Sequence, residues 1–215
     1  MPFPPRLAIA SKNPHKLREL AAICADWPVE WVTAETHDGP WPDADEPHDT
    51  YLHNAFEKAR TVARALGIPA VADDSGLEVD ALGGAPGPRS ARYAGEDATD
   101  EDNRRQLLAA LRGIPSAGRI ARYRCVAAIA WPDGRELHAE GTCEGTLGTK
   151  PRGAGGFGYD PLFLPEGWDR TMAELAPEEK DRISHRGRAF RTLRDLLASE
   201  LRDAPSDGPG RSSAG

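Results

Sequence analysis

The sequence predicts an α/β protein built around a mixed β-sheet. Short apolar runs typical of buried strands alternate with longer segments whose apolar residues recur at helical spacing. In addition, Pro132-Asp133-Gly134 separates two alternating segments in the manner of a β-hairpin turn. Strands joined through helices usually run parallel and hairpin strands run antiparallel, so the sheet should contain both directions.

The first half of the chain predicts helices with clear end signals. Asn13 is suited to cap a helix that begins near His15, with Pro14 as its first residue. Thr50 caps a second helix, and Gly67 ends it. Strands are expected at 7–10, 30–33 and 70–72, and an exposed acidic loop at 36–49.

The second half predicts two further helices, with Thr99 and Ser184 as their N-caps. The hairpin strands are expected at about 123–129 and 136–142. Residues 81–95 should be mainly loop, and residues 145–158 are glycine-rich and basic. Residues 203–215 consist largely of Gly, Ser, Pro and Asp, which predicts a disordered tail and leaves 1–202 as a single domain.

Composition and charge argue against several classes of protein. The 215 residues are 39% hydrophobic and 28% charged, as in ordinary globular domains. A formal net charge of −7 provides no overall basic field for a nucleic-acid backbone, so no nucleic-acid partner is expected. Residues 1–6 lack the apolar core of a signal peptide, and no segment is long enough to span a bilayer. We therefore expect a cytoplasmic protein without a membrane partner.

The three cysteines predict neither a disulfide framework nor a thiolate zinc site. Cys24, Cys125 and Cys143 lie far apart in the sequence, and none forms a Cys-x-x-Cys pair. We expect three reduced and mostly buried thiols.

The opening loop is a candidate anion site. Ser11 and Asn13 precede the first helix, and Lys16 lies in its first turn. Free N–H groups and the helix dipole favour an anion there, and a lysine would add a positive charge for a phosphate. Taken alone, the loop is better interpreted as an ordinary helix cap with a solvated lysine, and the spacing of a Walker loop is absent.

Asp73 and Asp74 directly follow the apolar run at 70–72. If the strand persists, the two carboxylates face opposite sides, and one can point into a cleft. Carboxylate oxygens are ligands that Mg²⁺ accepts, and a carboxylate near metal-bound water can take its proton. The alternative is a polar turn closed by Ser75 and Gly76. Glu46 and Lys58, by their local pattern, are interpreted as solvated surface residues, as is Asn54.

The glycine-rich segment 150–161 favours ligand binding. Glycines let a backbone approach a ligand closely, and Phe157 and Tyr159 could stack on a base. Asp160 could accept a hydrogen bond from a ring N–H.

The start of the last helix is a further candidate, because cations are disfavoured at a helix N-terminus. His185 and Arg186 both lie in its first turn. A bound, electron-rich partner would explain this placement, and an ordinary surface pair is the alternative.

Five segments together resemble the inosine triphosphate pyrophosphatase family, which removes non-standard purine nucleoside triphosphates from the nucleotide pool. They occur in the family's order and cover most of the chain from Leu7 to about Leu201. The segments are SKNPHK at 11–16, EPHDTYLHNAFEKA at 46–59, ADDSGLEVDALGGAPG at 72–87, PRGAGGFGYDPLF at 151–163 and MAELAPEEKDRISHRGRA at 172–189.

The resemblance implies a long mixed sheet flanked by helices, in two lobes with a central cleft, and usually a homodimer. It also implies Mg²⁺-dependent hydrolysis of ITP, dITP and XTP to the monophosphate and pyrophosphate. The bond broken would be the one between the α and β phosphates.

The resemblance further implies roles for individual residues. Asp74 is expected to accept the proton and to bind Mg²⁺ together with Glu46, and Asp73 to support it. The expected substrate contacts are Ser11, Lys12, Asn13, Pro14, His15, Lys16, Lys58, Ser75 and Lys180. The base is expected to meet Phe157, Gly158, Tyr159 and Asp160, and His185 and Arg186 to bind the 6-keto oxygen. Adenine's amino group would leave such donors unpaired.

The sequence departs from the family pattern at several places, including Ser11 where Thr is frequent and Tyr51 where Phe is frequent. Pro88-Arg89 stands where a Val-Tyr-like pair is common, and Asp181 stands where Asn is usual, which adds a negative charge beside Lys180. Two other functions stay open: a pyrophosphatase for modified pyrimidine nucleotides, and a nucleic-acid-binding module that uses the basic glycine-rich loop.

Overall fold

The computed structural model describes residues 3–44 and 48–203. Within these ranges the strands form one six-stranded sheet in the order β2-β1-β3-β4-β5-β6. β1 pairs in parallel with β2 and β3, whereas β3 to β6 pair antiparallel in turn, so the predicted mixed sheet is confirmed. The strands are β1 (Arg6–Ile9), β2 (Glu30–Val32), β3 (Ala70–Val79), β4 (Ile120–Ala130), β5 (Glu136–Leu147) and β6 (Phe163–Pro165).

The predicted helix caps are confirmed. Asn13, Thr50, Thr99 and Ser184 each accept a hydrogen bond from a backbone N–H in the first turn of the helix that follows. Gly67 ends the second helix in the left-handed conformation, at φ 66°. The α-helices are α1 (Pro14–Ile23), α2 (Tyr51–Leu66), α3 (Asp100–Ala110), α4 (Pro177–Ile183) and α5 (His185–Asp203), and the short 3₁₀ helices are η1 (Asp80–Leu82), η2 (Gly87–Arg92), η3 (Ser116–Gly118) and η4 (Met172–Glu174).

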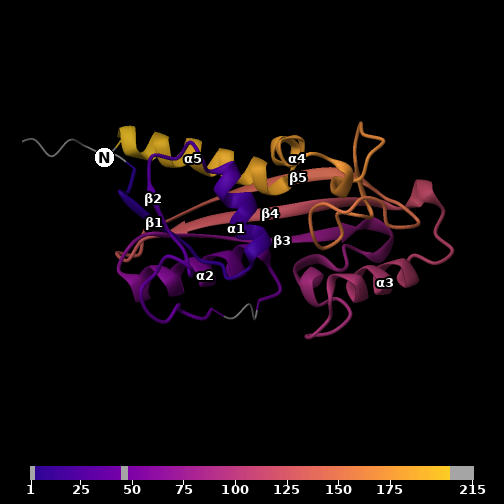
Figure 1. Ribbon diagram of the computed structural model, residues 1–215, viewed down its shortest axis with the longest axis horizontal. Helices are drawn as coiled ribbons and strands as arrows, with labels where there is room; N and C mark the ends of the chain where they lie inside the picture. Colours follow the sequence, from indigo (N-terminus) through magenta and orange to yellow (C-terminus); the bar gives the residue numbers. More distant parts are fainter. Residues whose placement is uncertain (1–2, 45–47, 204–215) are drawn as a thin grey trace, which may run out of the picture.

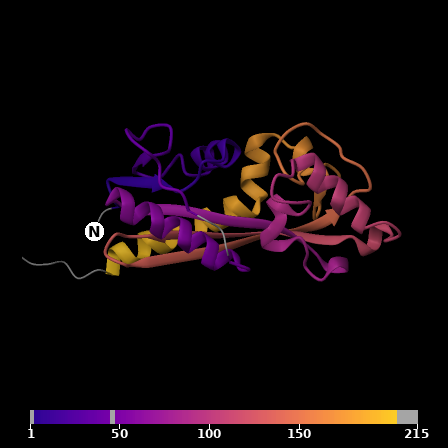
Figure 2. The same cartoon turned by 90° about the horizontal axis from the view of Figure 1, so that it is seen from below.

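Helices cover both faces of the long strands (Figures 1 and 2). α5 packs on β4 and β5, and α2 packs on β3 and β4. Alternate residues of β4 serve the two faces: Cys125 and Ala127 share a core with Phe190 of α5, whereas Val126 and Ala128 pack with α2. Residues on one strand therefore reach elements on opposite sides of the sheet.

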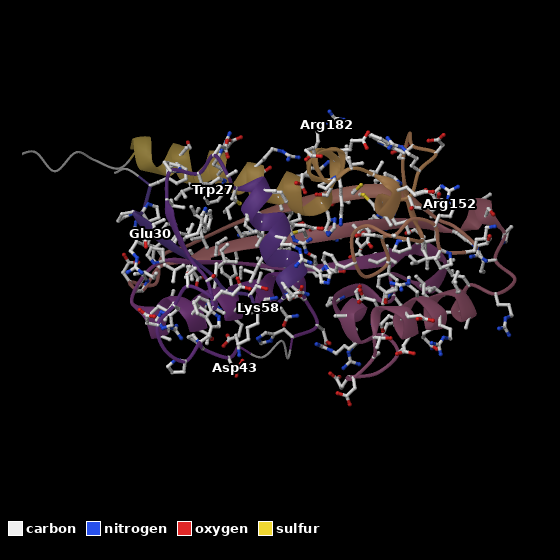
Figure 3. The ribbon with its side chains drawn as sticks, in the orientation of Figure 1. Trp27, Glu30, Asp43, Lys58, Arg152 and Arg182 are labelled. Carbon is white, nitrogen blue, oxygen red and sulfur yellow. The ribbon has the colours of Figure 1, made fainter. Side chains whose placement is uncertain are left out.

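The long strands β3, β4 and β5 connect two lobes. One lobe holds β1, β2, α1 and α2, and its apolar cores include Leu7, Trp27 and Val62. The core of the other lobe lies around α3 and β6 and includes Leu107 and Phe163. In Figure 3, Trp27 lies in the first lobe, Arg152 in the second, and Lys58 between them.

The strands are longer than the sequence pattern predicted. β3 continues through residues 73–76, for which a polar turn was the alternative, because ten consecutive residues pair with β4 and satisfy the backbone. β5 likewise continues to Leu147, five residues beyond its expected end at Thr142 and into the glycine-rich segment. The segment 81–95, expected to be mainly loop, contains η2 and the end of η1, and neither β6 nor α4 was predicted.

Gly141 of β5 allows α5 to approach the sheet closely. A Cβ at this position would lie 2.2 Å from the backbone oxygen of His185 and 2.5 Å from the backbone nitrogen of Ala189. The glycine therefore sets the position of the first turn of α5, which carries His185 and Arg186.

The remaining expectations concern thiols, membrane segments and the tail. The three cysteines are free and buried, as expected. No helix in the described part of the chain is both long and apolar enough to cross a membrane. α5 ends at Asp203, and residues 204–215 lie outside the described residues, so the disordered tail stays a prediction.

Candidate active site

Asp73 and Asp74 lie in the middle of β3 and point to opposite sides of the sheet. In the β-ladder, Asp73 is opposite Ala127 and Asp74 is opposite Val126. Each residue is only 3% exposed. Because the strand persists, the prediction that the two carboxylates face opposite ways holds, and the alternative of a polar turn is wrong.

Asp73 is surrounded by cations from α1 and α5. Its Oδ2 accepts hydrogen bonds from Nε and Nη2 of Arg186, at 3.2 and 3.0 Å, and from Oγ of Ser75 at 2.7 Å. Nζ of Lys16 lies 3.3 Å from the same oxygen. Burial acts to raise the pKa of Asp73, but Arg186 and Lys16 outweigh it and hold the pKa well below its usual range. The lowered pKa favours the ionised form of Asp73, which is a weaker base than an ordinary carboxylate and accepts protons poorly.

Asp74 has different partners, which come mainly from α2. Nδ2 of Asn54 donates to Oδ2 of Asp74 at 3.0 Å, and the backbone N–H of Ser75 donates to Oδ1 at 3.0 Å. Nζ of Lys58 lies 3.7 Å from Oδ1. Among the partners of Asp74 are thus two uncharged hydrogen-bond donors and the cation of Lys58.

The interpretation of Asn54 and Lys58 as solvated surface residues is wrong. Asn54 is fully buried and Lys58 is 8% exposed. Their four-residue spacing does place them on one face of α2, but that face packs against β3. Local periodicity classed both residues as polar and outward, whereas a buried carboxylate on the neighbouring strand provides their partner.

The opening loop meets the carboxylates at the N-terminus of α1. Asn13 and Lys16 line a pocket that also contains Asp74, which we call the main pocket. The same two residues line an adjoining recess, together with Ser11, Lys12, Lys58 and Asp73. Most of the predicted triphosphate contacts thus line two pockets that share Lys16 and the N-cap of α1, a combination suited to anions.

Two members of the predicted contact set lie elsewhere. Pro14 is the first residue of α1 and serves as a helix starter. His15 turns away from the recess and stacks on Phe157, with ring centroids 5.4 Å apart and 29° between the planes. His15 therefore belongs with the aromatic side of the site.

Phe157 forms an aromatic wall of the main pocket. Besides His15, two cations approach its ring: Nζ of Lys180 at 5.3 Å and Cζ of Arg186 at 5.6 Å from the centroid. A flat ring next to hydrogen-bond donors suits a planar heterocycle that carries acceptor oxygens.

Asp160 fixes the backbone of Phe157 and the side chain of Lys180 through hydrogen bonds. Its Oδ1 accepts from the hydroxyl of Tyr123 at 3.1 Å, and its Oδ2 accepts from the backbone N–H of Phe157 at 2.9 Å and from Nζ of Lys180 at 2.6 Å. Tyr159, which the sequence offered as a second stacking ring, is 3% exposed and donates its hydroxyl to the backbone of Ser90 at 2.8 Å. Phe157 is thus the better placed of the two rings for stacking.

Glu19 is part of the site, although it was not predicted from the sequence. It lies on α1, and its carboxylate receives hydrogen bonds from Lys180, at 2.6 Å, and from Nη1 of Arg186. Burial acts to raise the pKa of Glu19, and the two cations lower it by more, so the net shift is downward. Its position one turn after Lys16, on the same helix, was the available signal, but only contacts with α4 and α5 reveal the role.

His185 is buried and uncharged. Its ring stacks on Tyr123, with centroids 4.6 Å apart and 9° between the planes. Burial, together with Arg186 and Lys180, holds the pKa of His185 well below its ordinary value. Among the described residues its Nδ1 has no hydrogen-bond partner, although the residue lines the main pocket. A polar group of a ligand would satisfy this atom.

The electron-rich partners that the sequence suggested for Arg186 are protein carboxylates. Arg186 directs Nε and Nη2 at Asp73 and Nη1 at Glu19, and it is 2% exposed. Little of its donor capacity stays free for a ligand. Arg186 thus links α5 to β3 and α1.

A divalent cation would find Asp74 as its ligand among the described residues. Mg²⁺ is commonly held by one or two carboxylates together with substrate phosphates. Asp74 fits this pattern, since its carboxylate is buried and lines the main pocket with Lys16. Glu46 lies outside the described residues, so its part in a metal site stays a prediction.

Sequence comparison finds a family model and curated relatives that match most of the chain. A family model described as the Ham1 family matches residues 7–196. The dITP/XTP pyrophosphatase of Streptomyces avermitilis is 51% identical over 198 residues, which cover 89% of this chain and 98% of that protein. The dITP/XTP pyrophosphatase of Syntrophobacter fumaroxidans is 51% identical over 187 residues, which cover 87% of this chain and 79% of that protein.

Structure comparison gives the same relation. A HAM1 protein from Coxiella burnetii superimposes with a TM-score of 0.81 at 39% identity, covering 90% of this chain and 98% of that one. The nucleoside-triphosphatase, or dITP/XTP pyrophosphatase, of Mycobacterium abscessus superimposes with a TM-score of 0.70 at 42% identity, covering 87% and 98%.

Proposed function

Since the chain belongs to the Ham1 family, we propose that it is a pyrophosphatase for non-standard purine nucleoside triphosphates. It would convert ITP, dITP and XTP to the monophosphate and pyrophosphate. The family membership confirms the resemblance seen in the five sequence segments, and the relatives named dITP/XTP pyrophosphatase supply the reaction and the substrate class.

One observation carries the proposal: a single pocket combines groups suited to phosphates with groups suited to a planar base. Asn13, Lys16 and Asp74 line it, and so do Phe157 and His185. The cations and the helix N-terminus favour an anion, while an aromatic ring and an unpaired buried nitrogen favour a heterocycle. A nucleotide is the ligand that carries both parts.

Base selection follows from hydrogen-bond donors beside Phe157. Lys180 has three N–H donors, of which Glu19 and Asp160 occupy two. The third, with the neutral His185 ring, can meet a keto oxygen at position 6 of the purine. Adenine presents an amino group at that position, so the buried donors would lose their partner, which disfavours ATP.

We further propose that Mg²⁺ binds at Asp74, with Glu46 as a second ligand. When bound, the ion would offset the negative charge of the phosphate oxygens. Lys58, 3.7 Å from Asp74, lies close enough to share a phosphate with such a site.

The chain's own residues then have distinct tasks in the hydrolysis. Lys16 and Lys58 bind phosphate oxygens and stabilise the leaving pyrophosphate. Asp74 orients a water and accepts its proton as the water attacks the α-phosphorus, and the bond to the β-phosphate breaks. Asp73 stays ionised and keeps Arg186 and Lys16 aligned. The separation of the two carboxylates onto opposite faces supports this division of roles.

The resemblance also supports a homodimer that works in the cytoplasm. Light scattering on the purified protein at several concentrations would give the mass directly. A monomeric mass throughout would contradict the dimer and leave the catalytic proposal in place.

The reaction is tested by measuring pyrophosphate release from inosine, xanthosine, guanosine, adenosine and uridine triphosphates, with and without Mg²⁺. We expect metal-dependent release from the first two, well above the others. Asp74→Asn should lower kcat by at least about 100-fold, the usual scale of general-base catalysis. Preferred release from uridine triphosphate would favour the pyrimidine alternative. Salt-dependent binding of RNA or DNA without turnover would favour the nucleic-acid-binding module.

A further inference from the structure

Gly158 is held from both sides by two residues of α3. Its backbone N–H donates to Oδ2 of Asp100 at 2.6 Å, and its backbone oxygen accepts from Nη1 of Arg104 at 2.6 Å. Both hydrogen bonds involve a charged side chain, which makes them stronger than bonds between neutral groups. Asp100 and Arg104 are four residues apart, so they project from the same face of the helix.

Gly158, which these hydrogen bonds fix, is next in the sequence to Phe157, the aromatic wall of the main pocket. Gly158 directly follows Phe157 and has φ 59°, a left-handed conformation that suits glycine. Glycine also loses more backbone conformational entropy than any other residue when it is ordered, so hydrogen bonds from outside the loop are needed to fix Gly158. The contacts from α3 provide it one residue away from the Phe157 ring.

A second route leads from α3 to the same segment. Asn103 is 2% exposed; its Nδ2 donates to the backbone oxygen of Ala91 at 2.9 Å, and its Oδ1 accepts from the backbone N–H of Ala94 at 2.8 Å. These bonds fix the end of η2. The backbone oxygen of Ser90, in η2, accepts a hydrogen bond from the hydroxyl of Tyr159. α3 thus fixes two consecutive residues of the segment, Gly158 directly and Tyr159 through η2.

We propose that Asp100 and Arg104 are positioning residues that set the place of Phe157 for base binding. This inference rests on the proposed function, in which Phe157 stacks on the base. Both residues lie outside the five segments that carry the family resemblance. Asp100 lines the main pocket, and its role here is exerted through Gly158. They act on substrate binding and leave the chemical step to Asp74 and the lysines.

The kinetic test compares Asp100→Ala and Arg104→Met with two control variants on the same helix. The controls are Glu101→Ala and Arg105→Met, whose side chains form surface ion pairs within α3. If Phe157 is less well fixed, the protein binds the base less tightly in the ground state and in the transition state alike. KM for ITP should therefore rise about tenfold, while kcat changes less than about twofold. Asp100→Asn should restore a near-normal KM, since its amide oxygen can accept the same N–H.

Two further readouts separate positioning from general damage. Competitive inhibition by inorganic tripolyphosphate probes the phosphate side alone, and its Ki should not change in either variant. Amide hydrogen exchange across residues 153–162 should speed up about tenfold in Asp100→Ala and stay unchanged in Glu101→Ala.

Several outcomes would overturn the proposal. They are an unchanged KM with unchanged exchange, a loss of kcat in place of a rise in KM, or an equal effect in the control variants. If the wild-type protein fails to hydrolyse ITP, the proposed function fails. The hold on Gly158 is then judged by the exchange experiment, which needs no substrate.

Discussion

The side-chain amide of Asn54 donates a hydrogen bond of 3.0 Å to Oδ2 of Asp74, across the contact between α2 and β3. The same amide donates to the backbone oxygen of His48, and its Oδ1 accepts from the backbone N–H of that residue. Asn54 therefore connects the proposed catalytic carboxylate to the chain that leads into α2. Asn54 thus contributes, with the backbone N–H of Ser75, to the orientation of the Asp74 carboxylate.

Replacing Asn54 should impair both stability and turnover. In Asn54→Ala the buried carboxylate of Asp74 and two backbone groups of the exposed residue His48 lose a hydrogen-bond partner. We expect a loss of about 1–3 kcal/mol in the free energy of unfolding. kcat should fall about tenfold because Asp74 loses its fixed orientation. Urea unfolding and steady-state kinetics measure the two effects, with Arg64→Ala, on an exposed position of the same helix, as the control. A normal kcat in a folded Asn54→Ala protein would contradict the orienting role.

Glu19 should control base selectivity through Lys180 and Arg186. In Glu19→Gln, Lys180 and Arg186 no longer face a negative charge, and their N–H donors should shift relative to the base. The ratio of kcat/KM for ITP to kcat/KM for ATP should therefore fall about tenfold. The variant should also be about 2–4 kcal/mol less stable, because a buried pair is broken from one side. Because the folded-state pKa of Glu19 lies below its ordinary value of 4.5, its stabilising effect is present above that pH and is lost as the pH falls. An unchanged selectivity ratio would reject this role.

Asp181 should make the protein less stable at neutral pH than at mildly acidic pH. Burial, with Glu19 nearby, raises the pKa of Asp181 from 3.8 to about 6. The folded protein therefore keeps this proton over a range in which the unfolded chain has released it. Stability from this group falls as the pH rises from about 4 to 6. Asp181→Asn should add about 1 kcal/mol at pH 7.5, allowing for solvent screening, and little at pH 4. Urea unfolding of both proteins at the two pH values is the measurement, and an equal difference at both would contradict the assignment.

A side chain at Gly141 should displace the first turn of α5. The Cβ of Gly141→Ala would lie 2.2 Å from the backbone oxygen of His185, so the helix must move or the strand must bend. We expect a loss of about 1–3 kcal/mol in stability, together with a lower kcat/KM as His185 and Arg186 shift. Gly148→Ala is the matched control, because its nearest neighbours would lie at an ordinary 3.5 Å. Thermal unfolding measures the loss of stability, and steady-state kinetics measure the loss of kcat/KM. Equal losses in Gly141→Ala and Gly148→Ala would contradict the role of Gly141.

Local signals in the sequence determined where four of the α-helices begin and where the hairpin turns. The caps at Asn13, Thr50, Thr99 and Ser184 act within one helical turn, so their effect depends only on neighbouring residues. The hairpin turn at 132–134 is equally local. The ordered set of five segments also identified the family, and with it several residues that line the main pocket, among them Lys16, Asp74 and Phe157.

Strand length and burial were beyond local signals. The sequence placed the end of β3 at Ala72 because polar residues follow, yet the strand continues to Val79. Its carboxylates remain in the sheet because cations and amides from three helices offset the cost of burying them. The sequence pattern of α2 in turn gave no sign that Asn54 and Lys58 face a buried carboxylate.

The sequence by itself thus determined which residue types are present, which helices begin where, and which family the chain resembles. Only the tertiary structure decided which charges meet. Asp73 and Arg186 are 113 positions apart, and Glu19 lies 161 positions from Lys180. The physical reason is range: a cap or a turn is fixed by bonds within a few residues, whereas the state of a buried charge depends on every group within a few ångströms. Those groups are brought together only when the sheet and its helices have packed.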